Sequence, residues 1–143
     1  MKLDLTPLEN AVAQLEEALD IYNSDLASDH PHLKRHLRAA VIQAFEFTYE
    51  LSFRMLRRYL ELVSANPAEI DQLVFNDVIR EAYSQALLRS ELREWLEFRR
   101  NRGTTSHAYN EEKAQEVFES VPEFLREARY LLDRLHERNE SLD

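Results

Sequence analysis

Hydrophobic residues recur through the N-terminal part of the chain at alternating spacings of four and three, which is the period of an amphipathic helix. The segment Thr6-Pro7-Leu8-Glu9 predicts a helix start with a capping box, in which Thr6 is the cap and Pro7 the first helical residue. One apolar stripe follows it: Leu8, Val12, Leu15, Leu19, Tyr22 and Leu26. The pattern predicts a first helix with a single buried face.

The stretch from about His32 to Val63 contains neither glycine nor proline, so we expect one long helix of roughly 48 Å. Its apolar residues occupy more than one stripe. One line holds Leu33, Leu37, Ala40, Ala44, Phe47 and Leu51, and Val41, Phe45, Met55, Tyr59 and Leu62 lie near it. So wide an apolar arc suits packing on several neighbours, including one in another subunit, and favours a homodimer.

Helix boundaries can be placed through the rest of the chain from prolines and capping residues. Pro67 stops the long helix and starts a short one, and Asn76 and Ser90 can cap two further helices. Asn110 can cap the last helical region, in which Pro122 should kink or restart the helix. We therefore predict an all-α fold: an antiparallel up-down bundle of about four main helices plus short connecting helices, forming a single domain over residues 1–143.

Composition narrows the class of protein further. The 143 residues include one glycine, four prolines and no cysteine, so we expect one helical core and no disulfide or thiolate metal site. No apolar run is long enough for a membrane span, and the N-terminus lacks the apolar core of a signal peptide. We expect a cytoplasmic protein without a membrane partner.

The formal charge of −9 opposes general binding of polyanions, so we expect no DNA partner. Arginine nevertheless supplies fifteen of the eighteen basic residues. Residues 89–102, just before the only glycine, contain five arginines and three glutamates, a local excess of two positive charges. These residues are Arg89, Arg93, Arg99, Arg100 and Arg102, and Glu91, Glu94 and Glu97. Such a patch would attract phosphate locally.

The only glycine, Gly103, lies between two helical stretches and marks the octapeptide Arg102–Tyr109 as the candidate site. A turn at Gly103 would bring Arg102 and His107 into one pocket, with hydroxyls from Thr104, Thr105 and Ser106 beside them. An arginine fork binds phosphate, and a histidine transfers protons near neutral pH, so the pair suits phosphodiester chemistry. The alternative is a glycine helix stop, with Arg102 paired to a glutamate and His107 buried. We expect no cofactor.

Two other clusters have structural alternatives. His32 and His36 are four residues apart on the long helix and could bind a metal, but no carboxylate completes a known motif, so a solvated helix start is favoured and no metal is expected. Glu46 and Glu50 share a helix face and could act as paired acids. Glu50 also has the spacing for an ion pair with Arg54, while Glu46 could still approach the pocket.

Several ordered segments together resemble the HepT-type HEPN family, also called the nucleotidyltransferase substrate-binding protein family. They are Val41–Leu51 (VIQAFEFTYEL), Asn76–Ala82 (NDVIREA), Trp95-Leu96 and Thr105–Glu112 (TSHAYNEE). The resemblance extends from about Leu8 to Leu135. It implies a fold like the helical C-terminal domain of kanamycin nucleotidyltransferase, a dimer, and a separate partner, a small MNT-type nucleotidyltransferase.

In the toxin branch of this family, an arginine, four residues, a histidine, one residue and a tyrosine form a metal-independent ribonuclease site. The partner enzyme silences it by transferring AMP to the tyrosine. By position the resemblance implies catalytic roles for Arg102 and His107, modification of Tyr109, and binding of RNA or a nucleotide within a toxin-antitoxin pair. Many HEPN ribonucleases have Asn, Asp or His where this chain has Gly103. A non-catalytic binding or assembly subunit is therefore the alternative.

Overall fold

The computed structural model describes residues 2–104 and 110–142, and over these residues the chain folds into α-helices without a strand. The helices are α1 (Thr6–Tyr22), α2 (Asp25–Ser28), α3 (Pro31–Val63), α4 (Pro67–Asp71), α5 (Phe75–Ser84), α6 (Leu92–Gly103) and α7 (Glu111–Asn139). The four long ones are α1, α3, α6 and α7, and the three short ones connect them. The prediction of an all-α bundle is confirmed.

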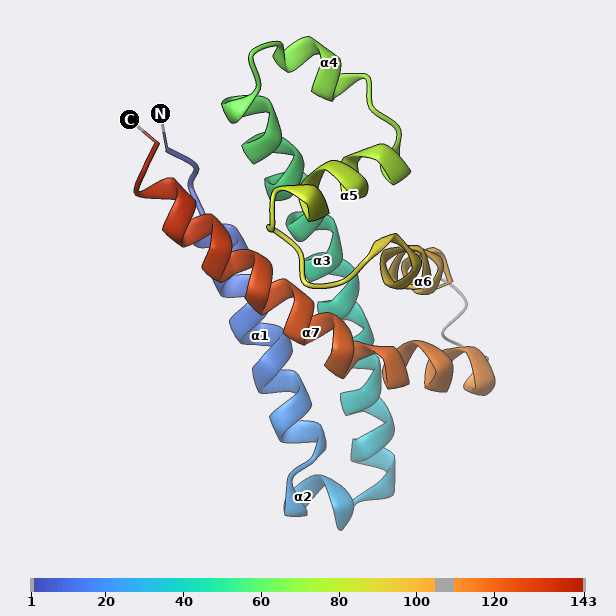
Figure 1. The fold of residues 1–143 in the computed structure, drawn as a ribbon. Coiled ribbons are helices and arrows are strands. Elements are labelled where there is room, and N and C mark those ends of the chain that lie inside the picture. The colour runs from blue at the N-terminus through green and yellow to red at the C-terminus, as the bar shows by residue number, and fades with distance from the viewer. Residues whose placement is uncertain (1, 105–109, 143) are drawn as a thin grey trace.

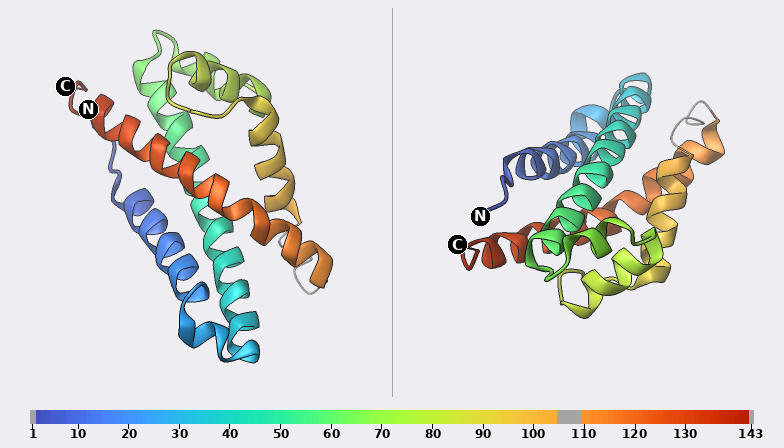
Figure 2. Two further views of the ribbon diagram at one scale, coloured as in Figure 1. Left: turned by 60° about the horizontal axis from the view of Figure 1, so that its bottom comes forward. Right: turned by 90° about the horizontal axis from the view of Figure 1, so that it is seen from above.

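Helix α3 lies in the middle of the molecule, with α1 and α2 on one side and α4, α5 and α6 on the other (Figures 1 and 2). Helix α7 crosses both α1 and α3 and also packs against α6. The two ends of the chain lie side by side (Figure 1), where Leu3 N–H donates to Asn139 Oδ1 at 2.8 Å and Asn139 Nδ2 donates to Leu3 O at 3.1 Å. The crossing of α3, α6 and α7 encloses the centre of the core.

Aromatic side chains fill this centre. Phe124 of α7 meets Phe45 of α3 at a ring separation of 5.1 Å and Phe98 of α6 at 5.2 Å, both edge to face. Trp95 packs against Phe98 in the same geometry at 5.6 Å, and the rings of Phe45, Trp95 and Phe124 are fully buried. Edge-to-face pairs add to the free energy gained from apolar burial. These rings therefore fix where α6 lies on α3.

The long helix forms as the sequence predicts, with Pro31 at its first residue and an end at Val63. Its wide apolar arc is only partly covered within the chain. Phe47 is 58% exposed, and Leu33 and Leu62 are also exposed. The N-terminal stripe also departs from the prediction at its end, because α1 ends at Tyr22 and Leu26 lies exposed on α2.

Two predictions for α7 are confirmed. The Asn110 side chain caps α7 by accepting the N–H groups of Glu112 at 3.0 Å and Lys113 at 3.3 Å. Pro122 lies inside α7. The helix bends in Figure 1 but does not restart, so the kink is the outcome.

Three predicted caps are wrong. Thr6 is the first residue of α1, and the residue at the cap position is Leu5, without a side-chain cap. Asn76 lies inside α5, which begins one residue earlier, at Phe75, and has no side-chain cap. Ser90 is buried ahead of α6, and its backbone N–H donates to Glu127 Oε2 at 2.9 Å. For Ser90 the reason lies in tertiary packing, because a carboxylate from α7 accepts the backbone N–H groups of this segment.

Glu127 is a fully buried carboxylate that ties the segment between α5 and α6 to α7. Its Oε1 accepts the Arg89 N–H at 3.0 Å, and its Oε2 accepts the Ser90 N–H and the Trp95 indole N–H at 2.8 Å. Burial raises the pKa of the Glu127 carboxyl above its ordinary value, while these N–H donors oppose the rise. Such an acid shapes the fold without touching solvent.

Among the described residues, the left-handed backbone conformation is found at Ala86, with φ 62°, and not at the glycine. It ends α5: the Leu87 N–H donates to Ala82 O at 3.0 Å, across the turn that Ala86 makes. This is the hydrogen bond of a Schellman cap, in which glycine is the usual residue. The expectation that Gly103 supplies the special turn is therefore wrong for the part of the chain described.

Candidate functional site

Arg102 lies in the last turn of α6 and reaches across to two carboxylates of α3. Its Nη2 lies 3.3 Å from Glu46 Oε1 and donates a hydrogen bond to Glu50 Oε1. That hydrogen bond is the main cause that raises the pKa of the Arg102 guanidinium, with the charges of Glu46 and Glu50 also contributing. The arginine is thus held charged and oriented along α3.

Glu46 and Arg102 are 56 residues apart in sequence, and the fold brings them together. The sequence pattern had indicated only that Glu46 could lie near the pocket. Glu50 bonds the same guanidinium instead of forming only the local pair with Arg54 that its spacing favoured. An ion pair between Arg102 and a glutamate was the alternative predicted for this arginine in place of a catalytic role. The paired arginine still lies at the surface, with its side chain 29% exposed, so a ligand can reach it.

Gly103 is the last residue of α6, and its φ is not positive. Thr104 follows as the C-cap, with its N–H donating to Arg100 O at 3.2 Å and its hydroxyl to Asn101 O at 3.0 Å. Helix α6 therefore ends at Gly103, as the alternative of a helix stop expected, but Gly103 itself has helical and not left-handed backbone. The other predicted residues of the octapeptide lie outside the described residues: Thr105, Ser106, His107 and Tyr109.

A pocket of about 460 Å³ opens beside Arg102, between α3, α6 and the start of α5. It is lined by Tyr49, Glu50, Phe53, Arg57, Leu73, Phe75, Arg99, Arg102 and Gly103. Three arginines and one glutamate line it. Two of these arginines also pair with carboxylates outside the lining, Arg57 with Asp71 and Arg102 with Glu46, so ion pairs offset most of the positive charge. This volume is in the range of small-ligand sites.

One wall of this pocket is aromatic. The rings of Phe53 and Phe75 stack at 5.2 Å, and the Arg99 guanidinium lies 4.6 Å from the centre of the Phe75 ring. Flat aromatic and guanidinium surfaces beside further arginines are the groups that bind an unstacked base and its phosphate. Neither the spacing of residues nor the composition had indicated Phe53, Phe75 or Arg57 as site residues. The sequence held one indication of this wall: Phe53 lies about one helical turn after Glu50.

Tyr49 lines the same pocket from α3 and is buried. Burial raises the pKa of Tyr49 to about 12, although the positive charges of Arg99 and Arg102 lower it in part. The phenol therefore stays protonated at neutral pH. It can donate a hydrogen bond but cannot act as a base.

His32 and His36 are exposed in the first turns of α3. Within residues 2–104 and 110–142, no three His, Cys, Asp or Glu side chains are grouped as metal ligands would be. In the same residues, no helix combines the length and apolar character needed to cross a membrane.

Comparisons with known proteins agree on one family. The family model for nucleotidyltransferase substrate binding protein like chains matches residues 3–137. The probable ribonuclease HepT of Haemophilus influenzae is 36% identical over 141 residues, which cover 97% of this chain and 96% of that protein.

Two solved structures resemble the fold. HI0074 from Haemophilus influenzae, described as having the fold of a substrate binding domain of a nucleotidyltransferase, superposes with a TM-score of 0.87 at 33% identity, over 93% of this chain and 99% of that one. A protein from Thermus thermophilus gives a TM-score of 0.67 at 30% identity, over 90% of this chain and 98% of that one.

Proposed function

The chain belongs to the nucleotidyltransferase substrate-binding protein family, and on this premise we propose that it is a HepT-like ribonuclease that works with a separate small nucleotidyltransferase. In this proposal the ribonuclease is the toxin of a toxin-antitoxin pair, and its partner is the antitoxin. The observation that carries the proposal is the position of Arg102, whose partly exposed side chain lies at the edge of a pocket lined by arginines, with an aromatic wall.

The reaction we propose needs only side chains of the protein. His107 takes the proton from a ribose 2′-hydroxyl, whose oxygen attacks the adjacent phosphorus. The bond from phosphorus to the 5′-oxygen then breaks, and that oxygen receives a proton, leaving a 2′,3′-cyclic phosphate. Arg102 stabilises the negative charge that develops on the phosphate oxygens. Phe53 and Phe75, which already stack on each other, form an apolar wall beside which a base next to the cut would lie.

Cleavage is tested by incubating a labelled RNA with purified protein in the presence of EDTA. The native protein should cut the RNA, and both Arg102→Ala and His107→Ala should fail to do so. The matched substrate control is a DNA oligonucleotide of the same sequence, which lacks the 2′-hydroxyl and should stay intact. Intact RNA with every protein, or equal cutting by His107→Ala, would contradict the ribonuclease proposal.

Regulation of this site is proposed to occur at Tyr109. The phenol oxygen attacks the α-phosphorus of ATP bound to the partner enzyme, AMP is transferred to the tyrosine, and pyrophosphate leaves. Mass spectrometry after mixing both proteins with ATP should show one added AMP group and loss of RNA cleavage. The same mass on Tyr109→Phe would show that another residue accepts AMP.

We also propose a homodimer, formed through the uncovered face of α3. Exposed Phe47 borders a groove of about 320 Å³ that is lined by Ala11, Gln14, Ala40, Gln43, Ala44 and Thr48. A phenylalanine and a groove on one face are self-complementary, so a twofold axis would bury each Phe47 against the other copy. A dimer would also bring two Arg102 and His107 sets into one assembly.

A second candidate is a non-catalytic subunit that presents a substrate to the nucleotidyltransferase. The observation in its favour is Gly103, which offers no side chain where many active relatives have a polar one, and which continues α6 as helix. In this case the pocket would still bind a ligand, but RNA would stay intact in the assay above.

A further inference from the structure

A second concentration of positive charge lies at the other end of α3. Between residues 30 and 45 the chain contains Lys34, Arg35 and Arg38, three of its five histidines, and neither aspartate nor glutamate. In a chain with a formal charge of −9, sixteen successive residues without an acid at the start of the longest helix are a local concentration of positive charge. Neither the octapeptide nor the pocket beside Arg102 includes any of them.

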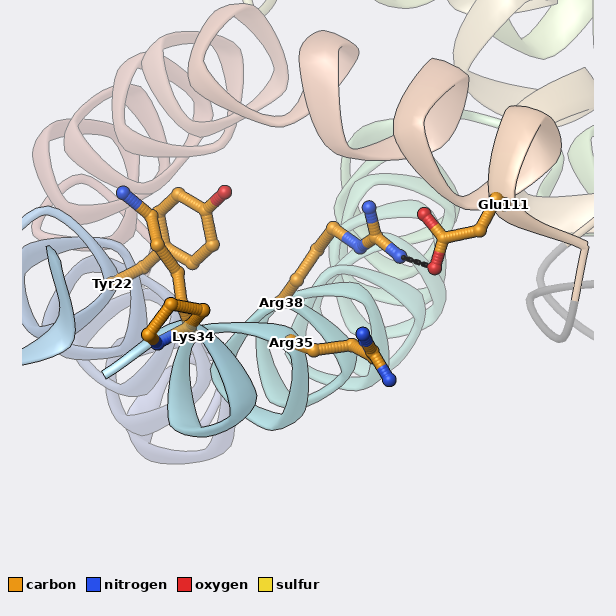
Figure 3. A pocket seen from close by; sticks show the side chains of 6 residues that line it. Tyr22, Lys34, Arg35, Arg38 and Glu111 are labelled. Carbon is orange, nitrogen blue, oxygen red and sulfur yellow. Dashed lines mark hydrogen bonds and ion pairs between the residues drawn. The ribbon is translucent and has the colours of Figure 1, made fainter. Parts of the chain in front are cut away.

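The three cations line a pocket of about 210 Å³ with Tyr22, Pro31 and Glu111 (Figure 3). Arg38 points across it to α7, where its Nη2 donates to Glu111 Oε1 at 2.7 Å and its Nη1 to Gln115 Oε1 at 3.2 Å. Lys34 Nζ lies 4.7 Å from the centre of the Tyr22 ring. Figure 3 shows Lys34 directed toward Tyr22 on one side, while Arg35 and Arg38 extend toward the side of the pocket where α7 begins at Glu111.

A carboxylate already occupies one place that an anion would take. The Glu111 side chain is 70% exposed, while that of Arg38 is only 14% exposed, so the arginine is fixed and the glutamate is free to leave. The hydrogen bond from Arg38 lowers the pKa of Glu111, and the charge of Arg35 acts in the same direction. A surface pair of this kind is worth little in water, and a phosphate offers the arginine fork a better-matched partner.

The volume of this pocket and the packing around the Tyr22 ring indicate which part of a ligand would fit. The pocket is smaller than the range of roughly 300–1,000 Å³ usual for small-molecule sites, so it suits a phosphate group and not a whole nucleoside. The Tyr22 ring already packs against Phe118 at 4.5 Å and against Lys34, which leaves it little surface for stacking a base. Recognition here would depend on charge.

We propose that Lys34, Arg35 and Arg38 bind a backbone phosphate of the single-stranded RNA that is cut at the Arg102 site. The proposal rests on the function proposed above. Arg35 and Glu46 are eleven residues apart, close to three helical turns, so they lie on the same side of α3 about 16 Å apart along its axis. A strand of a few nucleotides spans that distance. The subsite would hold the RNA in register while the scissile phosphate meets Arg102.

The test measures RNA binding separately from cleavage. All proteins carry His107→Ala, so that the probe, a fluorescent single-stranded RNA of about twelve nucleotides, stays intact during anisotropy titrations. The subsite variant is Lys34→Gln with Arg35→Gln, and Arg35→Gln alone is the milder form. The matched control is Arg80→Gln with Arg126→Gln, which removes the same charge from exposed pairs on α5 and α7.

The subsite variant should weaken RNA binding about five- to tenfold at low salt, and the plot of log affinity against log salt should become shallower by about 0.7 per lost phosphate contact. The control should stay within about twofold of the parent. Equal weakening by both double variants, or RNA binding too weak to measure in the parent, would overturn the subsite.

The same variants without His107→Ala separate the two proposals. If the native protein leaves RNA intact while binding still depends on Lys34 and Arg35, the ribonuclease proposal fails and the subsite stands. If the native protein cuts RNA and the subsite variant binds and cuts equally well, the subsite fails and the ribonuclease stands.

Discussion

The buried carboxylate of Glu127 accepts the indole N–H of Trp95 at 2.8 Å, where α7 meets α6. Trp95 and Arg102 are seven residues apart, close to two turns, and so lie on the same side of α6. The hydrogen bond therefore fixes the face of α6 that presents Arg102 to Glu46 and Glu50. Glu127, which does not itself line the pocket, thus helps to position the candidate catalytic arginine.

Replacing Glu127 by glutamine should destabilise the protein. Glutamine keeps the shape but has one acceptor oxygen, so an amide group would face either Arg89 N–H or the donors of Ser90 and Trp95. Each buried donor left unsatisfied costs about 1–3 kcal/mol of the free energy of unfolding. Urea unfolding followed by circular dichroism measures the change.

The control for this substitution is Glu123→Gln, on the same helix, whose side chain is 45% exposed and pairs with Arg89 and Arg126. Its effect should stay within about 0.5 kcal/mol. Equal costs for the two substitutions would mean that the buried hydrogen bonds of Glu127 contribute nothing specific.

Gly103→Ala should stabilise the protein by about 0.5–1 kcal/mol, because Gly103 is helical and alanine loses less backbone entropy on folding. Apart from its chain neighbours and the adjacent backbone of α6, a Cβ at this position would meet no atom of the described residues within 4 Å. Thermal unfolding should show a higher midpoint than for the native chain. A lower midpoint would mean that Gly103 needs a conformation that alanine resists.

Neutralising the carboxylates that hold Arg102 should tighten RNA binding. Glu46→Gln and Glu50→Gln each remove a negative charge beside the guanidinium that we propose binds phosphate. One charge at about 4 Å in water is worth about 1 kcal/mol, which corresponds to roughly a fivefold lower dissociation constant at low salt. Anisotropy titration in the His107→Ala background measures it.

The matching control is Glu137→Gln, an exposed glutamate near the end of α7 that pairs with Arg134. It should leave RNA binding unchanged. The gain for Glu46→Gln and Glu50→Gln should shrink as salt rises, because exposed charges are screened. Weaker binding by both variants would indicate that Arg102 does not contact the RNA.

Tyr49 should ionise late among the six tyrosines, with a pKa of about 12. The pKa of Tyr49 is raised above 10 in the folded state, so the folded protein holds the phenol proton more tightly than the unfolded chain does. The contribution of Tyr49 to stability is therefore complete below pH 10 and is lost as pH rises from 10 to 12. Ultraviolet titration should show a tyrosinate step near pH 12 that Tyr49→Phe removes. If the step persists in Tyr49→Phe, another residue causes it.

Phe47→Glu should convert the proposed dimer into a monomer, because a charge would replace an apolar ring that a second copy buries. Val74→Glu, at a residue that is 64% exposed away from the α1 and α3 groove, is the control and should leave the assembly intact. Sedimentation equilibrium at micromolar concentration distinguishes the two states. A native protein that sediments as a monomer would contradict the dimer.

The sequence by itself determined the helices. The long helix ends at Val63 as predicted, Asn110 caps α7, and Pro67 starts a short helix, because periodicity, proline and capping act within a few residues. The Arg102–Tyr109 motif and the family resemblance were also available from the chain alone. Such features need no knowledge of what lies across the core.

Tertiary structure decided what surrounds Arg102. Its carboxylate partners on α3, the Phe53 and Phe75 wall, and the hold of Glu127 on Trp95 all join residues far apart in sequence. It also placed the left-handed turn at Ala86, while Gly103 remained helical. The physical reason is that periodicity shows which face of a helix is apolar but not which helix covers it. The partners of a side chain follow from packing.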